Sequence, residues 1–117
     1  MSTPAGSPIA TYSEFWPHYL REHSRPTTRS IHFVGTGLAI LFPCAALVTG
    51  VALFLPLALV AGYGPAWFAH YFVEKNRPAT FTYPVWSLIS DFKMAYCWIC
   101  GRLNGELEKA GVGGLAR

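Results

Sequence analysis

The feature that most constrains the fold is an uncharged run between Arg29 and Glu74. Residues 30–73 contain no Asp, Glu, Lys or Arg, and most of them are apolar. One membrane-spanning helix needs about 20 predominantly apolar residues, so this run is long enough for two. Thr49-Gly50 is its natural break, because a short uncharged turn there would return the chain to its starting side. The run therefore predicts a helical hairpin with transmembrane helices at residues 31–49 and 51–73.

The composition agrees with a membrane protein. Of the 117 residues, 52% are hydrophobic and only 13% are charged, whereas soluble domains carry about 25% charged residues. A soluble domain of this size would have difficulty burying so much apolar surface. The net charge of +3 is not clustered as in nucleic-acid-binding proteins, so no nucleic-acid partner is expected. We predict a single all-α integral membrane domain, residues 1–117.

The basic residues predict the orientation of the hairpin. They lie on both sides of the apolar run and not at the Thr49-Gly50 turn: Arg21, Arg25, Arg29, Lys75, Arg77 and Lys93. The positive-inside rule then places both termini in the cytoplasm. The membrane would be the inner membrane of a bacterium, or the endoplasmic reticulum in a eukaryote. No cleavable signal peptide is evident.

Amphipathic helices are expected on both sides of the hairpin. A helix at residues 14–24, capped by Ser13, would place on one face Trp16, Tyr19, Leu20 and His23. Its aromatic face and basic flanks are typical of a helix on the membrane surface. Residues 84–100 would form a second interfacial helix or a third membrane helix, with an apolar stripe of Val85, Leu88, Ile89, Phe92, Tyr96 and Ile99. Residues 1–11 and 111–117 are expected to be disordered.

Small residues in the two spans predict which faces of the hairpin meet. On the first span a stripe starts at His32 and continues through Gly35, Thr36 and Ala39. On the second, a stripe ends at His70 after Ala58, Gly62 and Ala66. Small residues at four-residue spacing allow membrane helices to approach closely. Both stripes lead to a histidine at the same membrane surface, so we expect His32 and His70 to face each other.

The histidines are the candidate metal ligands. His23, His32 and His70 would converge on one interface, and Glu74 lies one turn beyond His70. Imidazole and carboxylate groups suit Fe(II), Zn(II) or Mn(II). Glu74 would bind the metal directly or hold the far nitrogen of His70. The sequence assigns no role to His18. In the alternative interpretation, the histidines are interfacial side chains hydrogen-bonded to the backbone.

Three basic residues flank this predicted site. Arg29, Lys75 and Arg77 would either anchor the helix ends at anionic headgroups or bind the carboxylate of an amphiphilic substrate. A site at the headgroup level would leave the acyl tail of such a substrate in the lipid.

Three segments of the sequence resemble a known family. They are Tyr19-Leu-Arg-Glu-His23, Ile31-His32 and His70-Tyr-Phe-Val-Glu-Lys-Asn-Arg-Pro-Ala79. Together they are similar to the 2-hydroxy fatty acid dioxygenase (Mpo1-like) family of small membrane proteins, over about residues 12–100. The resemblance implies a multipass membrane protein with Fe(II)-dependent α-oxidation, in which a 2-hydroxy fatty acid and O₂ give a fatty acid shorter by one carbon. The family's essential histidines match His23, His32 and His70.

The sequence thus leads to one principal functional hypothesis and two alternatives. The first is a non-haem iron dioxygenase acting on a hydroxylated fatty acid or related lipid. The second is a non-catalytic small membrane protein that binds lipid or metal. The third is a haem-binding hairpin with His32 and His70 as axial ligands, within one subunit or across a homo-oligomer. Metal content and a Soret band distinguish them.

Overall fold

The structure is a computed structural model that describes residues 8–112, and this part of the chain is all-helical. It forms two compact units. The hairpin unit comprises residues 25–78, with α2 (Pro26–Thr49), α3 (Phe54–Phe68) and the π-helix η1 (Ala69–Glu74). The flanking unit comprises residues 8–24 and 79–112, with α1 (Tyr12–Arg21), the short 3₁₀ turn η2 (Ala79–Phe81), α4 (Pro84–Ile99) and α5 (Leu103–Lys109).

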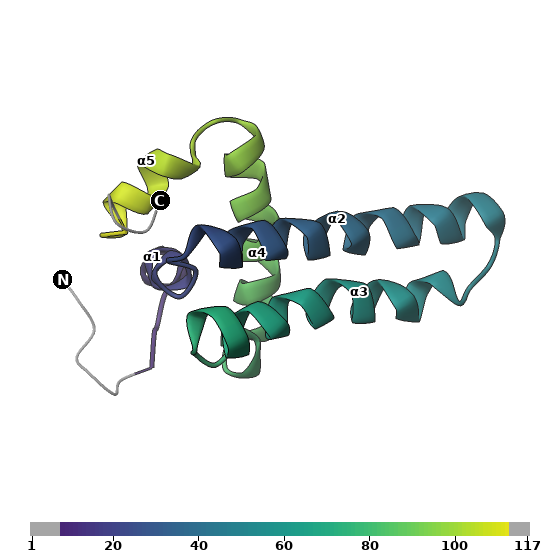
Figure 1. Cartoon of the computed structure of the whole chain (residues 1–117), viewed down its shortest axis with the longest axis horizontal. Helices are drawn as coiled ribbons and strands as arrows, with labels where there is room; N and C mark the ends of the chain where they lie inside the picture. Colours follow the sequence, from purple (N-terminus) through teal and green to yellow (C-terminus); the bar gives the residue numbers. More distant parts are fainter. Residues whose placement is uncertain (1–7, 113–117) are drawn as a thin grey trace. The chain divides into compact units, whose positions relative to one another are not determined.

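The hairpin unit consists of two antiparallel arms (Figure 1). Helix α2 begins at Pro26, five residues before the expected start, because proline suits the first helical turn. It ends at Thr49 and is capped by Gly50, whose φ of 74° is the left-handed conformation that glycine adopts without a Cβ penalty. The second arm begins at Phe54 rather than residue 51, after a turn. At its far end the α-helix widens into η1, which runs to Glu74.

The two arms meet through the predicted small residues. A Cβ atom added to Gly35 would lie 2.8 Å from the carbonyl oxygen of Gly62, and one added to Gly62 would lie 3.2 Å from the Cβ of Ala39. Ala58 and Ala66 are also buried. The inner surface of the hairpin is therefore made of glycine and alanine, as helix packing in lipid favours.

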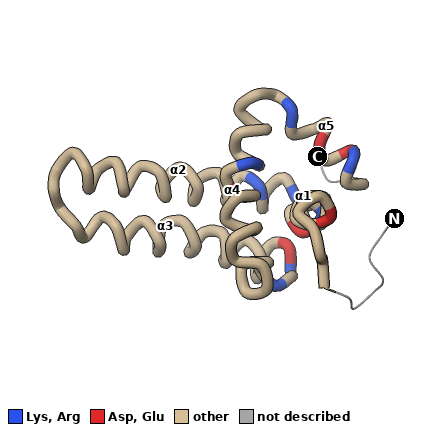
Figure 2. Tube along the Cα trace, turned by 180° about the vertical axis from the view of Figure 1, so that it is seen from behind, with Lys and Arg blue, Asp and Glu red and all other residues tan. Residues whose placement is uncertain are grey.

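The outer surface of the hairpin is apolar and uncharged. Its charged residues lie at the open end, and the arms between carry none (Figure 2). Among the described residues, α2 is the one helix long and apolar enough to span a membrane, with a mean hydropathy of 2.0 and 17% of that window buried. Helix α3 has 15 residues, fewer than the roughly 20 that a span needs. The structure thus shows a helical hairpin, and its two-span membrane topology stays a prediction.

The flanking unit is built on an aromatic cluster. Phe15 of α1 packs against Tyr83 and Trp86 at the start of α4, with ring centroids 5.2 and 5.6 Å apart. Trp16 stacks on Tyr19 along α1. Thr11 rather than Ser13 caps α1, because its side chain accepts the N–H of Glu14. The predicted aromatic face of α1 is buried within the protein, so it is not the face that would contact lipid.

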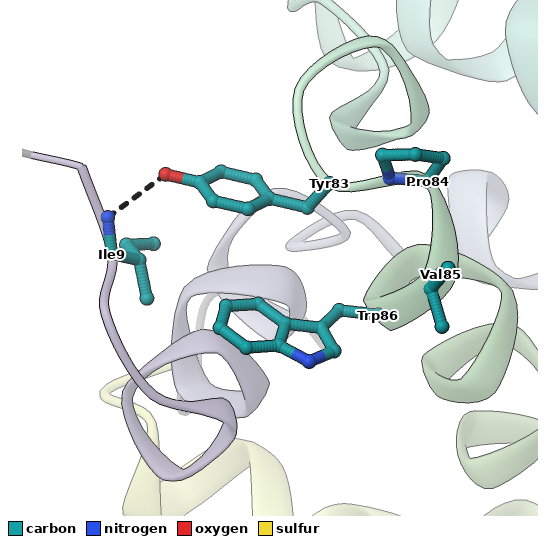
Figure 3. A pocket seen from close by; sticks show the side chains of 5 residues that line it. All are labelled: Ile9, Tyr83, Pro84, Val85 and Trp86. Atoms are coloured by element: carbon teal, nitrogen blue, oxygen red, sulfur yellow. Dashed lines mark hydrogen bonds between the residues drawn. The ribbon is translucent and has the colours of Figure 1, made fainter.

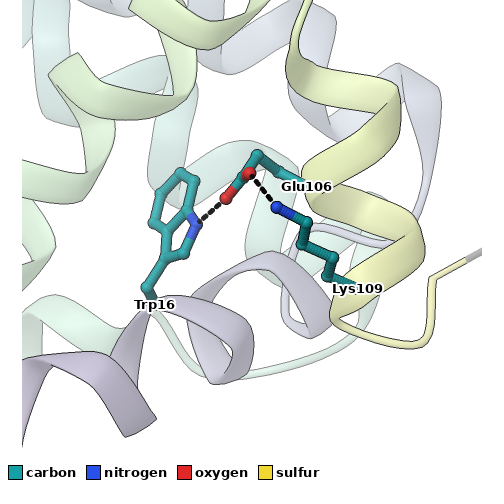
Figure 4. Close-up of polar contacts among 3 residues, drawn as sticks. All are labelled: Trp16, Glu106 and Lys109. Atoms are coloured by element: carbon teal, nitrogen blue, oxygen red, sulfur yellow. Dashed lines mark hydrogen bonds and ion pairs between the residues drawn. The ribbon is translucent and has the colours of Figure 1, made fainter.

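Polar bonds inside the flanking unit join α1 to α4 and α5. The hydroxyl of Tyr12 bonds that of Ser90 at 2.9 Å, and the hydroxyl of Tyr19 donates to Asp91 at 2.5 Å. Trp16 Nε1 donates to Glu106, which also pairs with Lys109 (Figure 4). Burial raises the pKa of the Asp91 carboxyl to about 7, although the Tyr19 hydrogen bond opposes the shift.

The segment before α1 is partly ordered. The backbone N–H of Ile9 donates to the hydroxyl of Tyr83, and both residues line a hollow of about 230 Å³ with Pro84, Val85 and Trp86 (Figure 3). Residues 8–11, within the segment expected to be disordered, thus have a described contact with the start of α4. Residues 1–7 and 113–117, which include most of the predicted tails, lie outside the described residues.

Helix α4 is apolar on the face that the flanking unit leaves exposed. Its buried positions are small or polar side chains and one methionine: Ser87, Ser90, Met94 and Cys97. Its exposed positions are the predicted stripe from Val85 to Ile99. Asp91 and Lys93 lie off this stripe, and both interact with α1. Asp91 accepts the hydrogen bond from Tyr19. The Lys93 ammonium lies over the rings of Trp16 and Tyr12 in cation–π contacts. A large apolar outer face is unusual in water and is suited to lipid.

The glycine contact between the arms leads to a stability prediction. Gly35→Ala places a methyl group against the backbone of α3 and should destabilise the hairpin by about 1–3 kcal/mol. Gly37→Ala is the matched control, since its Cβ would meet nothing within 4 Å and alanine favours a helix. Thermal unfolding in detergent should show a lower Tm for Gly35→Ala alone. Equal Tm values for the two variants would contradict the close packing.

Candidate metal centre

The hairpin brings His32 and His70 together. Their Nε2 atoms are 3.3 Å apart, and the two rings meet edge to face with centroids 5.2 Å apart. Both side chains are buried, with exposures of 4% and 2%. His32 lies one turn from Gly35 on α2, and His70 lies one turn from Ala66 on the opposite arm. The helical period thus places each histidine on the small-residue face, as the sequence predicts.

The backbone around His70 combines a π-helix with a left-handed residue. His70 lies in η1, and π-helical turns inside helices are frequent at functional sites. Lys75 then ends the turn with φ of 64°, the one described non-glycine residue with a positive φ. The carbonyl of His70 accepts the backbone N–H groups of Lys75 and Asn76. These bonds fix the direction in which the chain leaves His70.

Asn76 selects the tautomer of the neutral His70 ring. His70 Nδ1 lies 2.7 Å from the side-chain oxygen of Asn76, and an amide oxygen can only accept a hydrogen bond. Nδ1 therefore carries the proton, and in the neutral ring Nε2 keeps its lone pair. From the sequence, Glu74 was expected either to hold the far nitrogen of His70 or to bind the metal directly, and Asn76 was not among the candidate site residues. The turn at Lys75 is what folds the Asn76 amide back onto the ring.

The His32–His70 pair has the spacing of two ligands on one ion. Two nitrogens that each lie about 2.1 Å from a metal, at 90–110° to each other, are about 3.0–3.4 Å apart. The observed separation of 3.3 Å falls in this range. Axial ligands of one haem lie on opposite sides of the iron, roughly 4 Å apart. The arrangement within this hairpin therefore fits adjacent ligands better than an axial pair.

His23 belongs to the flanking unit, just beyond the end of α1. Its Nδ1 lies 2.7 Å from the carbonyl oxygen of Tyr19, and its ring stacks on the Tyr19 ring with centroids 4.1 Å apart. A carbonyl only accepts, so Nδ1 carries the proton here too. His23, His32 and His70 are all buried, and histidines of this kind could hold a metal ion.

Glu74 joins the two ends of the hairpin unit. Its Oε1 accepts the backbone N–H of Arg25, and its charge acts on the guanidinium of Arg29 in the first turn of α2. This contact anchors the start of one arm to the end of the other. In the structure, Glu74 thus connects the two arms through a hydrogen bond. A direct bond from Glu74 to a metal remains a prediction.

The remaining candidates occupy different environments. Arg29 is buried, at 6% exposure, whereas Lys75 and Arg77 are exposed. An exposed cation is available to headgroups or to an anionic ligand, and a buried one is more strongly oriented. His18 is half-buried on α1 beside Phe15, and burial lowers the pKa of its imidazole. No described contact connects His18 with the hairpin histidines.

The chain matches a known protein family. A family model described as "2-hydroxy-palmitic acid dioxygenase Mpo1-like" matches residues 9–103. This range includes His23, both hairpin histidines and the turn at Asn76. Comparisons with curated proteins and with solved structures found no match.

The left-handed residue after η1 generates a prediction about the hairpin end. Lys75→Gly should raise the free energy of unfolding by about 1 kcal/mol, because glycine adopts a positive φ without steric cost. Lys75→Val should lower it, since a β-branched side chain is most strained there. Thermal unfolding of both variants in detergent would test this order. A more stable Lys75→Val variant would rule out the left-handed turn.

Proposed function

The chain belongs to the Mpo1-like family, and we propose that it is a membrane-bound Fe(II)-dependent dioxygenase that shortens 2-hydroxy fatty acids by one carbon. The observation that carries the proposal is the buried His32–His70 pair, with two Nε2 atoms 3.3 Å apart. Burying two imidazoles at the end of an apolar hairpin is costly, and such residues usually serve a function. A shared metal ion would repay that cost.

His23 is the proposed third ligand. The backbone N–H of Arg25 is bonded to Glu74, one turn beyond His70. Consecutive Cα atoms are about 3.8 Å apart, so the Cα of His23 lies within about 8 Å of that of Arg25. Chain connectivity is therefore compatible with a ligand set that includes His23. Three imidazoles leave coordination positions open for a substrate, as non-haem iron sites require.

The overall reaction balances without another reductant. A 2-hydroxy acid and O₂ would give the acid with one carbon fewer, CO₂ and water, because this oxidation releases the four electrons that O₂ accepts. The bound Fe(II) would supply O₂ activation and Lewis acidity. The protein would orient the substrate: the buried Arg29 would bind its carboxylate, and the exposed Lys75 and Arg77 would attract it from the membrane surface.

The exposed surface of the hairpin supports a lipid substrate. Large apolar side chains on the outer faces of both arms are mostly solvent-accessible, among them Val34 at 60%, Leu41 at 58% and Leu59 at 63%. Inserted in a bilayer, these faces would contact acyl chains. A fatty acid whose carboxylate lies at the open end of the hairpin would then run its tail alongside the arms.

The proposed topology has two spans and cytoplasmic termini. Helix α3 and η1 follow each other directly, so the second arm is helical from residue 54 to residue 74, long enough to cross the hydrocarbon core. The exposed stripe on α4 would lie in the same cytoplasmic interface. Both proposals follow from the apolar outer faces and from basic residues that flank the arms.

The metal assignment predicts a histidine-specific loss. After anaerobic loading with Fe(II) and desalting in detergent, the wild-type protein should retain about one iron per chain. His32→Ala and His70→Ala should lose it, together with the turnover of 2-hydroxypalmitate. His18→Ala, a half-buried histidine on α1, should keep both. The assignment would be wrong if all four proteins retained iron equally, or if the wild-type protein retained no iron.

The topology predicts opposite labelling of the hairpin turn and of α5. In a background without cysteine, Thr49→Cys should react with an impermeant maleimide from outside intact cells. Asn104→Cys, on an exposed position of α5, should react only after the membrane is permeabilised. Labelling of both positions from the same side would overturn the two-span arrangement.

A further inference from the structure

His23 makes two separate contacts with Tyr19. Its Nδ1 donates to the Tyr19 carbonyl at 2.7 Å, and its ring lies on the Tyr19 ring with an interplanar angle of 28°. His23 follows the last residue of α1 by two positions, where a helix end usually frays. The hydrogen bond fixes the tautomer of the imidazole, and the stacking fixes the plane of the ring.

Tyr19 is itself fixed by the rest of the flanking unit. Its side chain is 1% exposed, and Trp16 stacks on it. Its hydroxyl donates to Asp91 of α4 at 2.5 Å, which is a short hydrogen bond. The position of the Tyr19 ring, and with it the stacking surface for His23, therefore depends on a carboxylate from a different helix.

We propose that Asp91 and Tyr19 are positioning residues that orient His23 for metal binding. Asp91 holds the phenol, the phenol ring holds the imidazole plane, and the Tyr19 carbonyl keeps the proton on Nδ1. Nε2 is then the coordinating nitrogen of His23, the same nitrogen that His70 presents. Neither residue contacts the reacting atoms. This inference rests on the proposed iron site, since it names what orients one of its ligands.

The flanking unit contains a matched control for this arrangement. Tyr12 also extends a hydroxyl from α1 to α4, where it bonds Ser90 at 2.9 Å. Tyr12→Phe and Tyr19→Phe therefore each remove one phenol bond between the same two helices. Of these two tyrosines, Tyr19 has the described contacts with His23. If Tyr19 had a purely structural role, the two variants would therefore have similar properties at the histidine.

The first test uses metal-free protein. Nitrogen-15 NMR of histidine side chains in detergent should show His23 as the Nδ1–H tautomer in the wild type and in Tyr12→Phe. In Tyr19→Phe and Asp91→Leu, the His23 signals should shift towards averaged tautomers. Unchanged His23 signals in both variants would overturn the positioning role. This result does not depend on whether the protein binds iron.

The second test measures Fe(II) affinity by competition with a chelator. Loss of an outer partner of a metal-bound histidine typically weakens affinity 10–100-fold. Tyr19→Phe and Asp91→Leu should show a loss of about this size, and Tyr12→Phe should not. Asp91→Asn keeps an acceptor oxygen for the phenol and should restore most of the affinity. Equal affinities for Tyr12→Phe and Tyr19→Phe would contradict the proposal, whereas absence of iron from the wild type would refute the iron site itself.

Discussion

The close approach of the two hairpin arms at Gly35 and Gly62 is the contact on which the candidate site depends. A side chain at Gly35 would meet the backbone of the other arm at 2.8 Å, so any larger residue would separate the helices. His32 and His70 lie one and two turns away on the same faces, where their Nε2 atoms are 3.3 Å apart. Packing in the hairpin and chemistry at its end are thus two consequences of one stripe of small residues.

In the hairpin and in α4, small and polar residues are buried and large apolar residues are exposed, which is the reverse of a soluble protein. The hairpin buries glycine, alanine and histidine and exposes leucine, valine and phenylalanine, and α4 buries serines behind an apolar face. Burial of apolar surface from water cannot be the main force that closes such an arrangement, because most of that surface stays outside. Close backbone packing, the Glu74 hydrogen bond and, in the proposal, a shared metal ion would supply the stability instead.

The hairpin and its histidine pair could be predicted from the sequence, because both follow from helical period alone. The uncharged run gives the helices, and the small residues give the faces that meet. Asn76 could not be assigned, since its contact with His70 depends on a π-turn and on a left-handed lysine, neither of which has a clear sequence signal. The hydrogen bond between Tyr19 and Asp91 could not be predicted either, because the two residues are 72 positions apart and no local pattern connects them. The start of α2 at Pro26 had a signal, proline in a first turn, but the expected bounds were taken from the uncharged run.

In the proposed site, His32 and His70, one from each arm of the hairpin, bind the same ion. Iron X-ray absorption of the Fe(II)-loaded protein in detergent tests it most directly, because imidazole rings give a characteristic outer-shell scattering pattern. About three imidazoles are expected around the iron in the wild type, and at least one should be lost in a His32→Gln variant that still retains metal. An iron environment of oxygen ligands alone, unchanged in that variant, would contradict it.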